Sequence, residues 1–204
     1  DAATPKKGGR LRIGRGHGST TDVLDPGLST NQFTMMQIYG TRNCLTEIDH
    51  TGKLVPELAE GWEVSDDAAQ WRFKLRKDVE FHNGKTLDTA DVIASIHHHT
   101  REGSKSAGKE LVKAIKEVKA DGKDTVVFTL EAGNADFPYV LADFHLPIMP
   151  AKDGGVDWQS GVGTGAYAIE NFDPGVRSIY KRFPNYFKKG RGHFDEVEML
   201  AIGD

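Results

Sequence analysis

Residues 54–95, LVPELAEGWEVSDDAAQWRFKLRKDVEFHNGKTLDTADVIAS, carry the clearest structural signals in the chain. Within residues 71–76, apolar and basic side chains alternate, which is the period of a strand with one buried face. The apolar positions are Trp71, Phe73 and Leu75. The basic row between them predicts a solvated surface, because acidic residues flank it on both sides. The stretch therefore predicts a sheet that buries one face.

The second half of the same stretch predicts a turn followed by a helix. Asn83 and Gly84 form a favoured tight-turn pair, since both tolerate positive φ. Asp88 is a candidate N-cap, and Asp91 places a second carboxylate in the first turn, where the helix end is positive. The helix would continue with an apolar face made of Val92, Ile93 and Ile96.

In the rest of the chain, the hydrophobic pattern predicts further strands and helices in mixed order. Helices are expected over residues 31–42, about 109–115 and, interrupted by Pro138, within 135–144. Strands are expected at residues 10–15, near Val118, and at 125–130, 166–171, 178–182 and 196–202. Because strands and helices do not alternate strictly, the predicted fold class is α+β.

Composition excludes several classes of protein. The chain has 204 residues, of which 38% are hydrophobic and 27% charged, so a globular chain of one ordinary or two small domains is expected. The formal charge of −4 argues against a dedicated nucleic-acid binder. No apolar run approaches the length that crosses a bilayer. The single cysteine, Cys44, lies among apolar residues and is interpreted as a buried thiol.

The glycine-rich segment that follows the first predicted strand resembles a nucleotide-binding loop only in part. Gly14 and Gly16 fit the dinucleotide fingerprint, but the third position is Ser19, and the following TTDVLDP does not open a helix. The glycines are therefore interpreted as positions where the backbone passes close to a strand or a ligand.

No motif assembles a catalytic centre. Successive helical residues point about 100° apart, so His97, His98 and His99 cannot converge on one metal ion. No nucleophile motif is present, and we assign no catalytic residue, metal or cofactor. A metal-dependent hydrolase that uses His82, His97 and nearby carboxylates stays open as an alternative.

Residues 54–95 resemble the signature region of the family 5 extracellular solute-binding proteins, the peptide/nickel-type receptors of ABC importers. The matching positions are Pro56, Leu58, Ala59, Trp62, Asp67, Phe73, Leu75, Arg76, Val79, Phe81, Gly84, Ala90, Asp91 and Val92. Further similar pieces are the Leu24, Asp25, Pro26 turn, the GTGAY segment at 163–167 and the RFPNYF segment at 182–187. Ala166 in place of proline and the FPN order at 183–185 depart mildly from the family pattern.

The resemblance implies the amino-terminal portion of a two-lobed receptor that closes on its ligand. Residues 1–42 would be the first segment of lobe I, residues 43–160 an inserted mixed α/β subdomain, and residues 161–204 the return into lobe I. The fold would be a periplasmic-binding-protein-like lobe I, partial and discontinuous, with the second lobe absent from this chain. The protein would be periplasmic, or extracellular and membrane-tethered.

The resemblance also implies non-covalent capture of a small solute, most often a peptide, and its delivery to ABC permease subunits. A monomer without a nucleic-acid partner is expected, and a solute-sensing module without transport is the alternative. Neutral hydrogen-bonding groups near the strand end and after the Leu-Asp-Pro turn are the candidate ligand contacts. These are Gly18, Ser19, Thr20, Thr30, Asn31 and Gln32. For each one, a turn or capping role is an equal alternative.

Overall fold

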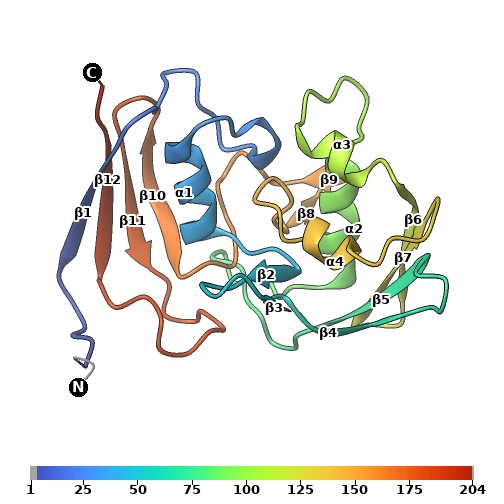
Figure 1. Ribbon diagram of the computed structural model, residues 1–204. Coiled ribbons are helices and arrows are strands. Elements are labelled where there is room, and N and C mark those ends of the chain that lie inside the picture. The colour runs from blue at the N-terminus through green and yellow to red at the C-terminus, as the bar shows by residue number, and fades with distance from the viewer. Residues whose placement is uncertain (1–3, 204) are drawn as a thin grey trace.

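Two four-stranded sheets organise the chain in the computed structural model, which describes residues 4–203 (Figure 1). The first, here called the split sheet, has the order β1-β12-β11-β10. Its strands come from distant parts of the chain: β1 (Arg10–Arg15), β10 (Tyr167–Asp173), β11 (Arg177–Arg182) and β12 (Glu196–Ala201). The second, the mid-chain sheet, has the order β4-β5-β7-β6. It consists of β4 (Ala59–Val64), β5 (Gln70–Leu75), β6 (Ile115–Asp121) and β7 (Thr125–Leu130).

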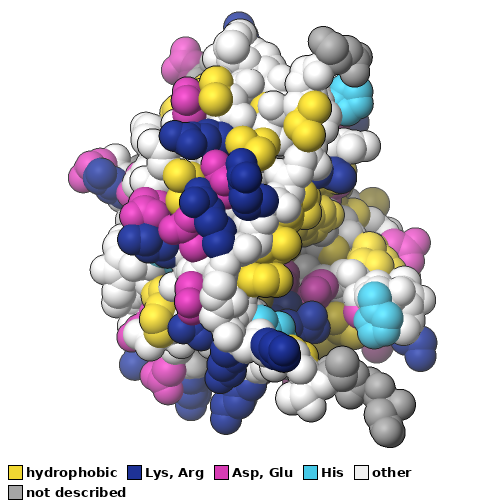
Figure 2. All heavy atoms as spheres, turned by 90° about the vertical axis from the view of Figure 1, so that its left-hand side faces the viewer, with side chains coloured by type: hydrophobic (Ala, Val, Ile, Leu, Met, Phe, Trp, Pro, Cys, Tyr) yellow, Lys and Arg dark blue, Asp and Glu magenta, His cyan; other side chains and the backbone are white. Residues whose placement is uncertain are grey.

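The split sheet joins the two ends of the described chain. β1 pairs in parallel with β12, with Arg10 opposite Glu196 and Arg12 opposite Glu198, whereas β11 is antiparallel to both β12 and β10. Viewed from the side of β1, basic and acidic side chains are interspersed over part of the surface, and hydrophobic side chains gather beside them (Figure 2). Cross-strand pairing of opposite charges gives this face its charged rows.

Glycines in and just after β1 allow close approach to the end of β12. A Cβ at Gly14, within β1, would clash with Ile202 Cδ1, one residue past β12, and one at Gly18 would lie 2.7 Å from Ala201 Cβ. A Cβ at Gly16 would have no described atom within 4 Å. Two of the three glycines are therefore explained by a neighbouring strand, which was one of the two predicted reasons.

Helix α1 (Gln32–Thr41) lies against the split sheet, between it and the rest of the molecule (Figure 1). Phe33 from this helix packs with Tyr180 and Met199 from the sheet in a small buried cluster. The Gln37 side-chain oxygen accepts hydrogen bonds from the hydroxyls of Ser178 at 2.8 Å and Tyr180 at 2.6 Å. The contact between helix and sheet is thus partly polar.

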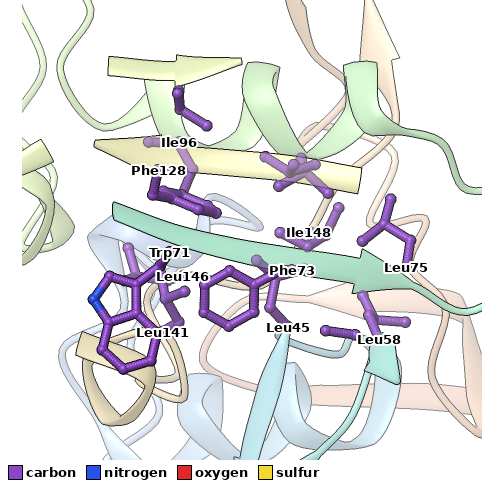
Figure 3. Close-up of a cluster of buried hydrophobic side chains, with 14 of the residues drawn as sticks. Leu45, Leu58, Trp71, Phe73, Leu75, Ile96, Phe128, Leu141, Leu146 and Ile148 are labelled. Atoms are coloured by element: carbon purple, nitrogen blue, oxygen red, sulfur yellow. The ribbon is translucent and has the colours of Figure 1, made fainter. Parts of the chain in front are cut away.

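The mid-chain sheet buries one face under helices. Trp71, Phe73 and Leu75 of β5 point into a large hydrophobic cluster, as the alternation predicted (Figure 3). The covering elements include α2 (Thr89–His98), α3 (Gly108–Val112) and α4 (Phe137–Val140). Short hairpins are formed by β2 (Thr46–Ile48) with β3 (Leu54–Pro56), and by β8 (Ala151–Lys152) with β9 (Gly155–Val156).

Helix α2 begins as predicted. The Asp88 carboxylate accepts a hydrogen bond from the Asp91 N–H at 3.1 Å, and the Asp91 carboxylate accepts one from the Asp88 N–H at 2.9 Å, which completes a capping box. Gly84 has φ of +86° in the turn before the helix. The turn at Gly84 and the helix start at Asp88, both predicted from the sequence, are therefore present in the structure.

Two predicted helices differ in extent from those observed. The helix predicted within 135–144 shortens to α4. Pro138 lies in its first turn, where the backbone N–H that proline lacks would have no partner within the helix. The predicted helix at about 109–115 gives way to β6 after Val112.

Candidate functional site

The turn that precedes α1 is fixed by a buried carboxylate. Asp25 accepts a hydrogen bond from the Gly27 N–H at 2.9 Å, and both its oxygens lie 3.0 Å from His98 Nε2. Arg101 Nη2 is 3.2 Å from the same carboxylate. Burial alone would raise the pKa of Asp25, but these hydrogen bonds and positive charges outweigh it and lower the pKa. The turn is therefore anchored to the carboxyl end of α2.

Asn31 caps α1 and ties it to the segment before the turn. Its side-chain oxygen accepts a hydrogen bond from the Thr34 N–H at 3.0 Å, and its amide group donates one to Asp22 Oδ1 at 2.7 Å. The Ser29 and Thr34 hydroxyls lie 2.7 Å apart. The capping role that was weighed for Asn31 is thus present, and this ordering leaves Thr30 and Gln32 exposed at the surface while Ser29 is buried.

A groove of about 700 Å³ lies at the amino end of α1. Three of the predicted contacts, Thr30, Asn31 and Gln32, line it. The other lining residues come from the loop after β1, the turn, α1 and the loop after α4, and are His17, Ser29, Met35, Phe144 and His145. The structure therefore brings together half of the predicted site.

The other predicted contacts lie outside the groove. The Ser19 N–H donates to Asp22 Oδ2 at 2.9 Å, and the Ser19 hydroxyl lies 2.8 Å from that of Thr21. A Cβ at Gly175, in the turn between β10 and β11, would approach Thr20 N to 2.7 Å. Gly18, Ser19 and Thr20 thus form a loop that packs against the split sheet, and their ligand role stays a prediction.

The sequence did not predict the groove residues His17, Met35, Phe144 and His145, of which the last two come from the most distant segment. The rings of Phe144 and His145 lie 4.0 Å apart, and Phe144 also packs against Tyr39, with ring centroids 6.2 Å apart. Asp143 two residues before His145 signals a local turn, and its carboxylate accepts a hydrogen bond from the His145 N–H at 2.9 Å. Nothing in the sequence indicates that this turn meets Ser29, which is 116 positions away.

Beyond Phe144 lies a second groove of about 530 Å³, which contains a buried ion pair. Glu57 accepts hydrogen bonds from Asn43 Nδ2 at 2.7 Å, the Cys44 N–H at 3.0 Å and Lys188 Nζ at 2.9 Å. Burial raises the pKa of Glu57, although the Lys188 charge acts in the opposite direction. Asn43 also accepts from the Thr164 hydroxyl at 2.8 Å. The polar groups of Glu57, Asn43 and Lys188 are satisfied within this cluster. The cluster is therefore a structural junction between distant segments of the chain.

His82 and His99 make structural hydrogen bonds. His82 Nδ1 accepts from the Gly163 N–H at 3.2 Å, and its Nε2 lies 2.9 Å from the Gly165 carbonyl. His99 Nδ1 is 2.6 Å from the Ser106 hydroxyl, and burial lowers the pKa of His99 to about 4. His97 is exposed on α2. Among residues 4–203 no group of three or more metal-ligating side chains gathers.

Cys44 is buried as predicted, and burial together with nearby carboxylates raises the pKa of its thiol. Its Sγ donates to the Asp143 carbonyl oxygen at 3.3 Å. A protonated, enclosed thiol is a packing residue rather than a nucleophile. In the part of the chain that the structure describes, no helix combines the length and hydropathy needed to cross a membrane.

Comparison with known proteins matches this architecture to one family. Residues 53–204 match the bacterial extracellular solute-binding proteins, family 5 Middle. The Bacillus subtilis protein YhjP is 36% identical over 145 residues, which cover 71% of this chain and 24% of that protein. A probable di/tripeptide-binding protein 5 of Pseudomonas aeruginosa is 30% identical over 172 residues, which cover 71% of this chain and 33% of that protein. The chain thus spans a third or less of these relatives.

A solved structure shows the same fold. The periplasmic binding protein AgaA from A. tumefacien R10, in complex with agropinic acid, superposes with a TM-score of 0.85 at 27% identity. The superposition covers 95% of this chain and 40% of AgaA. The predicted α+β, periplasmic-binding-protein-like fold is therefore confirmed. The chain belongs to the family 5 bacterial extracellular solute-binding proteins, as its resemblance to that family implied.

Proposed function

We propose that this chain supplies one wall of the ligand cleft in the substrate-binding component of an ABC importer. It would capture a small solute, with peptide as the favoured class, and deliver the solute to membrane permease subunits. The observation that carries the proposal is the groove at the amino end of α1, where Thr30, Asn31 and Gln32 converge. The family of the chain supports a ligand role for this groove.

The chemistry of the groove supports non-covalent recognition. The Thr30 hydroxyl and the Gln32 side-chain amide offer neutral hydrogen-bonding groups, and Met35 and Phe144 offer apolar surface. Backbone recognition of an extended peptide leaves its side chains free to vary. The relative from Pseudomonas aeruginosa, described as a probable di/tripeptide-binding protein, favours the peptide class. We assign no catalytic residue, because none of these groups forms a nucleophile and base pair.

We propose the same division of the chain as the resemblance implied. Residues 1–42 and 161–204 would form lobe I, because they carry all four strands of the split sheet. Residues 43–160 would form the inserted subdomain, because they carry the mid-chain sheet and its covering helices. A periplasmic location, or an extracellular one with a membrane tether, is proposed with the transport role.

Calorimetric titration of the full-length protein tests the proposal. Trialanine, agropinic acid and a nickel–histidine complex are the three probes, which separate a peptide receptor from an opine or metal receptor. We expect trialanine to bind, and Gln32→Ala to weaken it by about fivefold through the loss of one polar contact. Gln70→Ala is the matched control, because Gln70 is also exposed but starts β5 in the mid-chain sheet.

Each result of these titrations bears on a different part of the proposal. Binding of only agropinic acid or the nickel complex would overturn the peptide class and leave the groove in place. Equal weakening by Gln32→Ala and Gln70→Ala would overturn the groove as the ligand wall. Failure of all three probes to bind would overturn the proposed capture of these solutes.

A further inference from the structure

His145 connects the loop after α4 to the proposed ligand wall. Its Nε2 lies 3.0 Å from the Ser29 carbonyl oxygen, and its Nδ1 lies 2.7 Å from Asp143 Oδ1. Its side chain is mostly buried, and the ring packs on Phe144. Ser29 immediately precedes Thr30, Asn31 and Gln32, so the imidazole contacts the backbone of the segment that lines the groove.

The partners of His145 determine its charge. A carbonyl oxygen and a carboxylate oxygen are both acceptors, so each ring nitrogen must carry a proton to make both hydrogen bonds. Only the imidazolium form has two N–H groups. In agreement with this geometry, the hydrogen bond to Asp143 and that to Ser29 raise the pKa of His145, against the effect of burial.

We propose that His145 is a positioning residue for the ligand wall, holding residues 29–32 in place only while both of its ring nitrogens are protonated. This inference rests on the proposed function, because it assigns the wall to ligand binding. When His145 loses a proton, the remaining N–H stays on Nδ1, since a carboxylate is the stronger acceptor. The bare Nε2 then faces the Ser29 carbonyl oxygen, and two acceptors at this distance repel each other.

The titratable groups around His145 are Asp143, His99, His17 and Cys44. Asp143 on its own loop has a lowered pKa, because the hydrogen bonds and charge of His145 outweigh burial, so it stays ionised near neutrality. His99, at the carboxyl end of α2, has its pKa lowered to about 4 and stays neutral there. His17 lines the same groove from the loop after β1. Cys44, which contacts the Asp143 carbonyl, has a raised thiol pKa.

The direction of the pH dependence follows from the raised pKa. The contact is fully present below the ordinary histidine pKa of about 6.5 and is lost as the pH rises through the higher folded-state pKa. We therefore expect trialanine affinity to fall about fivefold between about pH 6 and about pH 9, the effect of losing one hydrogen bond.

NMR on the full-length protein tests the contact between His145 and Ser29 without any ligand. The imidazole of His145 and the carbonyl carbon of Ser29 are labelled, and both are titrated with pH. We expect the two signals to share one midpoint above about 6.5, and Asp143→Asn to lower that midpoint by removing the carboxylate. A Ser29 signal that ignores the His145 titration, or a midpoint unchanged in Asp143→Asn, would overturn the inference.

Binding variants add a readout that a purely structural role would not move. His145→Gln places an amide N–H near the position of Nε2, so trialanine affinity should stay at its low-pH level and lose its pH dependence. His145→Ala should hold the affinity at every pH about fivefold below the low-pH level of the wild type. His97→Gln, on the exposed face of α2, is the matched control and should keep the wild-type pH profile. A His145→Ala profile like that of the wild type would contradict the inference.

The two proposals can fail separately. If trialanine does not bind, the peptide class fails, while the coupled NMR titration still decides the His145 contact. If trialanine binds with a pH-independent affinity and the two NMR midpoints differ, the positioning role of His145 is overturned. The proposal that the groove binds the ligand is then unaffected.

Discussion

The two sheets are built from different kinds of contact. Every buried hydrophobic residue of the large cluster under the mid-chain sheet lies between Leu45 and Ile148, mostly in neighbouring elements (Figure 3). The split sheet depends on a small cluster of Phe33, Tyr180 and Met199, and on the pairing of β1 with β12 across the length of the chain. A hollow of about 260 Å³ beside Met199 leaves this second cluster partly open.

This difference bears on how each of the two sheets forms and is stabilised. Contacts between near neighbours in sequence cost little loop-closure entropy and can form early, whereas the pairing of β1 with β12 must close a long loop. The mid-chain sheet therefore has a dense core of its own, and the split sheet gains order from the elements packed on it. The proposed ligand groove lies at the amino end of α1, between these two regions.

The largest expected effect is loss of the mid-chain core. Phe73 is fully buried, and its ring packs against those of Trp62, Trp71, Phe128 and Phe137. We expect Phe73→Ala to lower the free energy of unfolding by about 4 kcal/mol, from lost burial and the cavity left behind. Urea denaturation followed by tryptophan fluorescence measures this, since Trp62 and Trp71 report on the same cluster.

Met199→Ala is the matched comparison in the split sheet. We expect a loss of about 2 kcal/mol, at the low end for a buried methionine, because the adjoining hollow already limits its contacts. An equal or larger loss for Met199→Ala would contradict the contrast between the two cores.

The next effect concerns the junction between the two regions. Lys188→Met removes the charged partner of Glu57, whose side chain is 10% exposed. We expect a loss of about 3 kcal/mol near neutral pH, because an unpaired buried carboxylate is costly. The loss should shrink as the pH falls, since burial raises the pKa of Glu57 and the group can protonate.

The double variant Glu57→Gln with Lys188→Met is the control for this junction. It removes both charges, so most of the lost stability should return. If the single variant loses the same free energy at acidic and neutral pH, the charge of Glu57 is not the cause.

The smallest expected effect on stability concerns the N-cap of helix α2. Asp88→Ala removes the N-cap of α2, and we expect a loss of about 1 kcal/mol in the free energy of unfolding. Asp66→Ala, in the exposed turn before β5, should change stability far less. Comparable losses for the two variants would mean that the capping box contributes little.

Much of the mid-chain region was predictable because its signals are local. The alternation at Trp71, Phe73 and Leu75 depends only on strand periodicity, and the cap at Asp88 depends only on the four orphan amides of a helix start. The grouping of Thr30, Asn31 and Gln32 was also predictable, since they are adjacent in sequence and precede a helix.

The tertiary structure alone decided which distant segments meet. Residues 18–20 and 30–32 were predicted as one site, but the loop packs against the split sheet while the turn faces the groove. The contact of His145 with Ser29 and that of Asn43 with Thr164 join positions more than a hundred residues apart. Local patterns specify which face of an element is buried, whereas the partner of that face depends on the packing of the whole chain.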